Sequence, residues 1–120
     1  MTPAQKSLVG RIRAAISDKA PRREVAMIGG LAFMVNEKMI VSAGKDGNLL
    51  VRVPAADHEQ LLEAPGASQA EMGTGRSMGP GWITVTADHL IDDDSLAFWI
   101  SIALENNSSV TSRQPDTASD

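Results

Sequence analysis

The sequence predicts an α+β protein in which an antiparallel sheet is flanked by helices. Residues 25–53 contain short apolar runs separated by clusters of Gly, Asn and Asp, a pattern typical of antiparallel strands joined by tight turns. Residues 3–17 and 93–106 instead carry apolar side chains at helical spacing. Because strands and helices are segregated along the chain, a doubly wound parallel sheet is excluded. The expected order is helix, three or four strands, helix, one or two strands, helix.

The first helix is expected over residues 3–17. Its apolar side chains share one face: Leu8, Val9, Ile12, Ala15 and Ile16. Pro3 suits the first turn, where a backbone donor would have no partner. The Ala20-Pro21 pair ends the helix, because the residue before a proline disfavours helical backbone.

The first strands are expected over 25–35, 39–43 and 49–53. The glycine pair 29–30 interrupts the first run, which indicates a sharp turn, a bulge or a close backbone approach. Residues 36–37, Asn-Glu, are predicted to form a two-residue hairpin turn, since Asn tolerates a positive φ.

The run over 25–35 is apolar on both faces, which predicts a strand covered on both sides or a face used for association. One face carries Leu31, Phe33 and Val35, and the other carries Ala32 and Met34. Phe33, Met34 and Trp82 are candidate interface residues, because aromatic residues and Met are enriched at binding surfaces. The partner would be another protein or a second copy in a homodimer. The alternative is that Trp82 packs under the last helix against Trp99.

The second half of the chain contains three more elements and an optional short strand. A helix is expected over 55–64, a strand over 82–86 and the last helix over about 93–106, and a short strand is allowed over 70–72. Asp92, Asp93 and Asp94 are interpreted as helix caps rather than as a cation site, because the spacing of a calcium-binding loop is absent. The polar residues 106–120 are expected to form a disordered tail after a domain spanning 1–105.

The composition is that of one globular domain. The 120 residues are 42% hydrophobic and 22% charged, and none is a cysteine, which excludes disulfides, thiolate nucleophiles and cysteine-based zinc sites. No apolar run approaches the length of about 18 residues that a membrane span needs. The N-terminus lacks the apolar core of a signal peptide. A cytoplasmic protein is therefore expected.

Charge is distributed unevenly. Residues 1–24 carry six basic side chains against two acidic ones, whereas the remaining residues carry five basic and thirteen acidic ones. The basic segment makes Arg11, Arg13, Arg22 and Arg23 candidate nucleic-acid contacts. Aromatic residues are only 3% of the chain and tyrosine is absent, so a platform for stacking bases is not expected. A solvated helix beside an acidic body is the favoured interpretation.

No catalytic, cofactor-binding or metal-binding residues are predicted. His58 and His89 are the only histidines, and neither lies in a motif that combines a nucleophile, a base and an orienting group. We therefore do not expect an enzyme. Residues 73–76, which are Gly73, Thr74, Gly75 and Arg76, form a glycine-rich loop that is a candidate anion site. The loop lacks the Lys-Ser/Thr pair of a P-loop, and a surface turn is the favoured interpretation.

Five segments resemble the TfoX N-terminal-domain family of competence regulators and their single-domain relatives. They are residues 27–36, 49–53, 57–62, 75–82 and 92–99, and they follow the family's order along residues 7–104. Residues 27–36 are similar to its M-F-G-G-x-x-F-x-x-N-G stretch. The chain differs in having Glu37 after Asn36 and an apparent extra residue in the loop 79–81, and the second domain of full-length regulators is not expected.

The resemblance implies a fold of the order α-β(3)-α-β(2)-α, similar to secretion chaperones. It also implies a role in regulation through protein contacts, since the family's regulators act as co-activators with a cyclic-AMP receptor protein. The family supplies no catalytic residues and no cofactor to carry over. The sequence thus predicts a small non-catalytic interaction module, with two alternatives: a transcription regulator that contacts nucleic acid through its first helix, and small-molecule or phosphate binding at 73–76.

Overall fold

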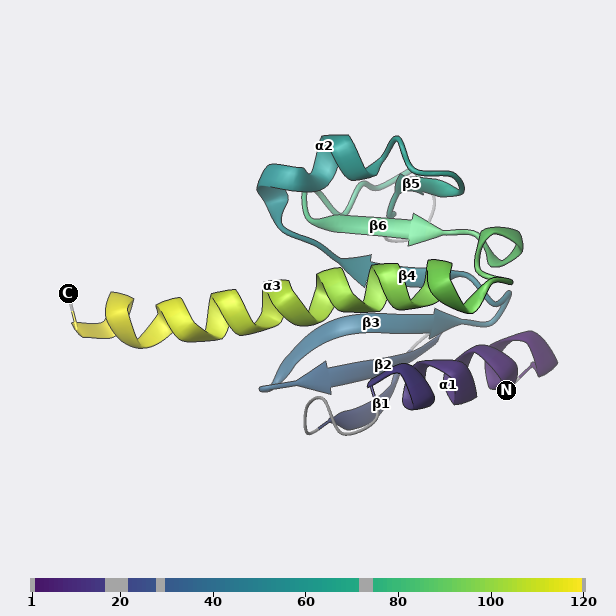
Figure 1. Ribbon diagram of the computed structural model, residues 1–120, viewed down its shortest axis with the longest axis horizontal. Coiled ribbons are helices and arrows are strands. Elements are labelled where there is room, and N and C mark those ends of the chain that lie inside the picture. Colours follow the sequence, from purple (N-terminus) through teal and green to yellow (C-terminus); the bar gives the residue numbers. More distant parts are fainter. Residues whose placement is uncertain (1, 17–21, 28–29, 72–74, 120) are drawn as a thin grey trace.

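One six-stranded sheet with helices on one side forms the protein (Figure 1). The computed structural model describes residues 2–16, 22–27, 30–71 and 75–119, with side chains up to residue 108. The helices and strands are α1 (Pro3–Ile16), β1 (Arg23–Met27), β2 (Gly30–Val35), β3 (Lys38–Gly44), β4 (Leu49–Arg52), a 3-10 turn η1 (Ala55–Asp57), α2 (His58–Leu61), β5 (Ala67–Gln69), β6 (Trp82–Val85), a 3-10 turn η2 (Ala87–His89) and α3 (Asp93–Ser119).

All neighbouring strands of the sheet are antiparallel, in the order β1-β2-β3-β4-β6-β5. This arrangement confirms the predicted α+β class. The first group has four strands, which is within the three or four predicted and one more than the family resemblance implies, because the run over 25–35 divides into β1 and β2. The second strand begins at Gly30, one of the two glycines predicted to mark a turn, a bulge or a close backbone approach: a Cβ atom there would lie 2.8 Å from the Ala43 carbonyl oxygen and 2.8 Å from Ser42 Oγ, so only glycine fits. Residues 28–29 lie outside the described part of the chain.

The turn between β2 and β3 is the predicted two-residue hairpin. Asn36 and Glu37 both have positive φ angles, of 53° and 64°, as a type I′ turn requires. A bulge between Phe33 and Met34 shifts the register, so that Phe33 pairs with Val41 and Met34 pairs with Met39.

The hydrophobic core lies between the sheet and the two long helices. Figure 1 shows α1 and α3 crossing the same face of the sheet, where α1 contacts β3 and α3, and α3 contacts β3 and β4. The core contains the predicted faces of both helices and alternate residues of the strands: Leu8, Val9, Ile12, Ile16, Phe33, Val41, Leu49, Val51, Ile83, Val85, Leu96, Trp99, Ile100 and Ala103 are among its members. The periodicities of 3.6 and 2 residues therefore identified the buried side of these elements.

The last helix is longer than predicted. It continues past residue 106 to Ser119, and Figure 1 shows its C-terminal end extending beyond the sheet. Asn107, assigned by the sequence to the tail, is buried: its Nδ2 donates to the Val35 carbonyl oxygen at 2.8 Å, and its Oδ1 accepts from Asn36 Nδ2 at 2.9 Å. The folded domain therefore includes at least Asn107. Disorder beyond that residue stays a prediction.

Two shorter elements also differ from the prediction. The helix expected over 55–64 is a 3-10 turn followed by the four-residue α2. The short strand allowed over 70–72 instead lies at 67–69, where β5 pairs with the outer edge of β6. The segment 54–65, which contains α2, lies beside α3 and forms one wall of a groove.

Candidate functional site

The face of the sheet opposite α1 and α3, here called the open face, is apolar at its centre. The strand register aligns Met34 with Met39 and Ser42 with Leu50, and places Arg52 opposite Trp82. Val25, Met34, Met39, Leu50 and Trp82 are half-buried on this face. Within the described residues, both long helices lie on the other side of the sheet.

The open face contains two of the three predicted interface residues, Met34 and Trp82. The third, Phe33, is fully buried in the core beneath the helices, which corrects its assignment to an interface. The physical reason is strand alternation: neighbouring residues of β2 point to opposite faces, so only one of Phe33 and Met34 is available for contact.

Trp82 does not pack against Trp99, the alternative that the sequence left open. Its ring faces Arg52 on the open face, with the guanidinium carbon 5.4 Å from the ring centroid. Trp99 lies on the helical side, where it contacts Phe98 edge to face with 5.2 Å between ring centroids. The two tryptophans therefore serve different surfaces of the sheet.

The four arginines proposed for nucleic-acid contact all face carboxylates of the protein. Arg11 Nη2 lies 3.0 Å from Asp93 Oδ1, and Arg23 Nη2 lies 2.7 Å from Glu37 Oε2. Arg13 binds Glu24 through two nitrogens, at 2.7 and 2.8 Å, and Arg22 lies 3.7 Å from the same carboxylate.

The pairing of Arg13 also affects the titration of its partner. The hydrogen bond and charge of Arg13 hold the pKa of Glu24 below its usual value. A phosphate would have to displace carboxylates that already occupy these guanidinium groups, which weighs against the nucleic-acid alternative.

The candidate anion loop falls largely outside the described residues. Gly73 and Thr74 lie there, whereas Gly75 has a φ of 78° and Arg76 is exposed. Anion binding at this loop stays a prediction.

His58 holds the loop that leads into β6. Its side chain is buried, and its Nδ1 accepts a hydrogen bond from the Gly81 N–H at 2.9 Å. Its Nε2 lies 2.8 Å from Gln69 Oε1, and the Gln69 amide in turn donates to the carbonyl oxygens of Gly79 and Trp82. Both ring nitrogens are thereby occupied, so His58 has a structural role in this arrangement.

Of the three aspartates predicted to cap the last helix, Asp92 makes the capping contacts. Asp92 Oδ1 accepts a hydrogen bond from the Asp94 N–H at 3.3 Å, and the Asp92 carbonyl accepts from Ser95 and Leu96, which caps the helix. Asp93 pairs with Arg11. Among the described residues, no group of three or more His, Asp or Glu side chains is arranged to hold a metal ion.

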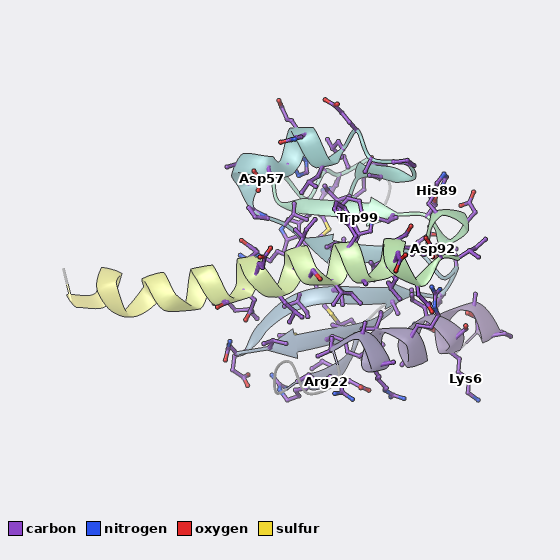
Figure 2. The ribbon with its side chains drawn as sticks, viewed as in Figure 1. Lys6, Arg22, Asp57, His89, Asp92 and Trp99 are labelled. Carbon is purple, nitrogen blue, oxygen red and sulfur yellow. The ribbon has the colours of Figure 1, made fainter. Side chains whose placement is uncertain are left out.

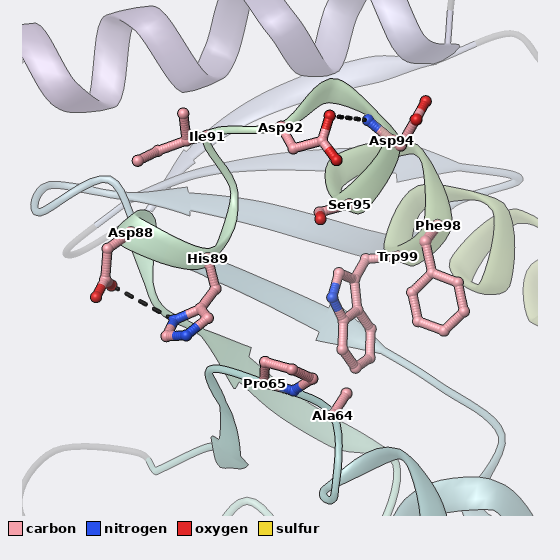
Figure 3. Close-up of a pocket in the computed structure, with 10 residues that line it drawn as sticks. All are labelled: Ala64, Pro65, Asp88, His89, Ile91, Asp92, Asp94, Ser95, Phe98 and Trp99. Carbon is pink, nitrogen blue, oxygen red and sulfur yellow. Dashed lines mark hydrogen bonds and ion pairs between the residues drawn. The ribbon is translucent and has the colours of Figure 1, made fainter.

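A groove runs along α3 on the helical side of the sheet. Two hollows form it, of about 590 and 630 Å³, and they adjoin at Ala64 and Phe98, which line both. Figure 3 shows Phe98 and Trp99 reaching from α3 toward Ala64 and Pro65, with His89 at the near end. Leu61 and Ile102 continue the apolar lining in the second hollow.

The groove leaves large apolar side chains in contact with solvent. Ile91 is 78% exposed and Phe98 is 49% exposed, values far above those of the core residues beside them. Its rim is acidic: Asp57, Glu63, Asp88, Asp92, Asp94 and Glu105 line it. None of its lining residues is Lys or Arg.

Sequence reasoning missed this groove. Its apolar residues come from two segments that are far apart in the sequence, α3 and residues 54–65. Neither segment shows an unusual pattern alone. The available signal was Phe98, which lies beside the predicted buried stripe of α3 rather than within it. An exposed aromatic next to a core-facing tryptophan indicates a second contact surface on the same helix.

Residues 16–107 match the family model of the TfoX N-terminal domain. Since this match covers most of the chain, the protein belongs to that family. A comparison with curated proteins found no match. Among the described residues, no helix is both long and apolar enough to cross a membrane.

Proposed function

We propose that the protein is a small, non-catalytic regulatory module that acts through protein–protein contacts, with the open face of the sheet as its self-association surface. The observation that carries this proposal is the half-buried apolar patch of Val25, Met34, Met39, Leu50 and Trp82, which the helices leave uncovered. Patches of large apolar side chains on a sheet face are typical of contact surfaces.

The charge of the open face suits a second copy of the chain. A two-fold contact places a surface against itself, so a face of one strong charge sign would repel its twin. The protein carries a net charge of −4, yet the open-face positions of β1–β4 and β6 contain no carboxylate, and Arg52 is stacked on Trp82. Copies of the chain can therefore approach on this face with the least electrostatic cost.

Regulation of competence or transcription is the role that family membership suggests for such a module, and it forms part of this proposal. A cytoplasmic location, supported by the absence of cysteine, completes it.

The test is the solution mass by light scattering over a range of concentrations. We expect a dimer, with twice the mass of the 12.7 kDa chain, in the wild type. Leu50→Glu and Met34→Glu place a carboxylate on the open face and should give folded monomers, because each buries a charge against its twin. Ser101→Glu is the matched control, since Ser101 is exposed on α3. A wild type that stays monomeric at all concentrations contradicts the proposal, and so does a folded Leu50→Glu protein that stays dimeric.

A further inference from the structure

We propose that the groove along α3 binds a basic amphipathic helix of another protein, with the apolar face of that helix on Phe98 and Ile102 and its Lys or Arg side chains on the acidic rim. This site is distinct from the open face, because it lies on the opposite side of the sheet.

The shape of the groove favours a helix as its occupant. The α3 residues that line it fall on one side of the helix at spacings of three or four positions, with Asp92 just before the first turn: Asp94, Ser95, Phe98, Trp99, Ile102 and Glu105. Such a stripe along one helix is the surface against which a second helix packs its own ridges. From Asp92 to Glu105 the stripe is about 20 Å long, the length of a helix of about 14 residues.

The wall of the groove opposite α3 is also apolar and leaves space between itself and the helix. Leu61, Ala64 and Pro65 line it from the segment that follows β4, and Leu61 and Ala64 are only half-buried. Ile91, at the end of the groove, is the most exposed large apolar residue recorded in the described part of the chain. Three surfaces therefore present apolar atoms to one elongated space, and a ligand helix would cover all three.

The carboxylates of the rim favour a positively charged ligand. Asp88, Asp92 and Asp94 lie near the end of the groove where α3 begins, and Asp57, Glu63 and Glu105 lie around the other hollow. Figure 2 shows Asp57, His89 and Asp92 on this side of the molecule, whereas Lys6 and Arg22 lie on the side of α1 and β1. All six carboxylates are exposed, and within the described residues none of them forms an ion pair with Lys or Arg. Arg11, beside the end of the groove where α3 begins, is engaged by Asp93 and by the Ile91 carbonyl oxygen. The rim is thus complementary to Lys and Arg along both edges of a ligand helix.

The test uses three labelled synthetic peptides of about 14 residues. The first has Leu at helical spacing with Lys and Arg elsewhere, the second has the same Leu pattern with Glu, and the third has the composition of the first in an order without an apolar face. Binding is measured by fluorescence anisotropy, and the contacted residues are mapped by amide chemical-shift changes. We expect the first peptide to bind at least about tenfold more tightly than the other two. Its shift changes should fall on residues 54–65 and 88–105.

Variants of the protein locate the site. Phe98→Asp and Ile91→Asp are both at exposed positions, so they should leave the core intact. Each should lower the affinity for the first peptide by about tenfold. The double variant Glu63→Gln with Glu105→Gln should lower the affinity for the first peptide by about fivefold. Glu59→Gln with Glu71→Gln is the control, because it changes net charge equally at exposed positions outside the groove.

Four results would overturn the proposal. They are the absence of binding, equal binding of the scrambled basic peptide, equal binding of the acidic peptide, and equal effects of the two Glu→Gln pairs. The peptide test is independent of dimer formation through the open face. The Leu50→Glu variant, which is expected to be monomeric, can be tested with the same peptides.

Discussion

His58 is a buried residue that links separate parts of the chain. It connects α2 to Gly81, 23 residues later, and through Gln69 to the backbone of Gly79 and Trp82. The sequence placed His58 correctly on the apolar side of a short helix. Its partners were not predictable, because a glutamine and a glycine N–H carry no periodic signal.

Replacing His58 with Ala should destabilise the protein by about 2–4 kcal/mol. The change leaves the buried Gly81 N–H and Gln69 Oε1 without partners and opens a cavity. The free energy of unfolding from urea titration measures this effect. His89→Ala is the control, since that side chain is 43% exposed and its loss should cost less than about 1 kcal/mol. Equal stabilities of the two variants would show that the His58 network contributes little.

The arginines show the same limit of prediction at the residue scale. Their types and numbers are visible in the sequence, but their partners are not. Arg11 pairs with Asp93, 82 positions away, because α1 lies beside α3 in the folded protein. A basic segment in the sequence is therefore largely neutralised by the tertiary structure.

At the scale of elements, α3 combines three roles along its length. Its first turn is capped by Asp92, its middle supplies Trp99 and Ile100 to the core and Phe98 to the groove, and Asn107 binds the β2–β3 hairpin. The predicted end near residue 106 followed from the loss of apolar periodicity. A buried asparagine with two hydrogen bonds gives no such periodicity, so the helix was predicted too short.

Truncation separates the packed part of α3 from the rest. A chain ending at Ser108 should keep the stability of the full protein within about 0.5 kcal/mol, because the residues beyond are poor helix formers and include Pro115. A chain ending at Asn106 should lose about 1–3 kcal/mol, since the Val35 carbonyl and Asn36 lose their partner. Thermal or urea unfolding measures both. A point variant, Asn107→Ala, should reproduce the loss, and an equal loss in the Ser108 chain would contradict the assignment.

At the scale of the whole molecule, the charges form an acidic protein with an internally paired basic edge. Residues 25–120 hold thirteen carboxylates against five basic side chains. Arg22 lies on the side of α1 and β1, away from the groove, whereas Arg11 reaches the start of α3, where Asp93 pairs with it. Such a field repels polyanions and attracts cationic partners. This agrees with the proposed ligand of the groove and disagrees with nucleic-acid binding.

We therefore expect no measurable binding of duplex DNA, even at about 50 mM salt, where phosphate contacts are strongest. Fluorescence anisotropy with a labelled duplex measures this. A charge-altered variant, Glu24→Gln with Glu37→Gln, frees Arg13 and Arg23 and should bind DNA more tightly than the wild type. Salt-sensitive binding by the wild type that is lost on replacing Arg11 and Arg13 would restore the nucleic-acid alternative.

The sequence by itself determined the α+β class, the antiparallel strands, the Asn36-Glu37 hairpin and the buried stripes of α1 and α3. These features depend on local backbone chemistry and on periods of two and 3.6 residues, which are written in short stretches of chain. Only the tertiary structure decided which face of each strand the helices cover, and hence that Phe33 is core while Met34 and Trp82 are accessible. It alone also paired the arginines and assembled the groove from residues 54–65 and 88–105. The physical reason is that both strand faces are apolar and each helix meets distant segments, so these contacts depend on how the elements pack together.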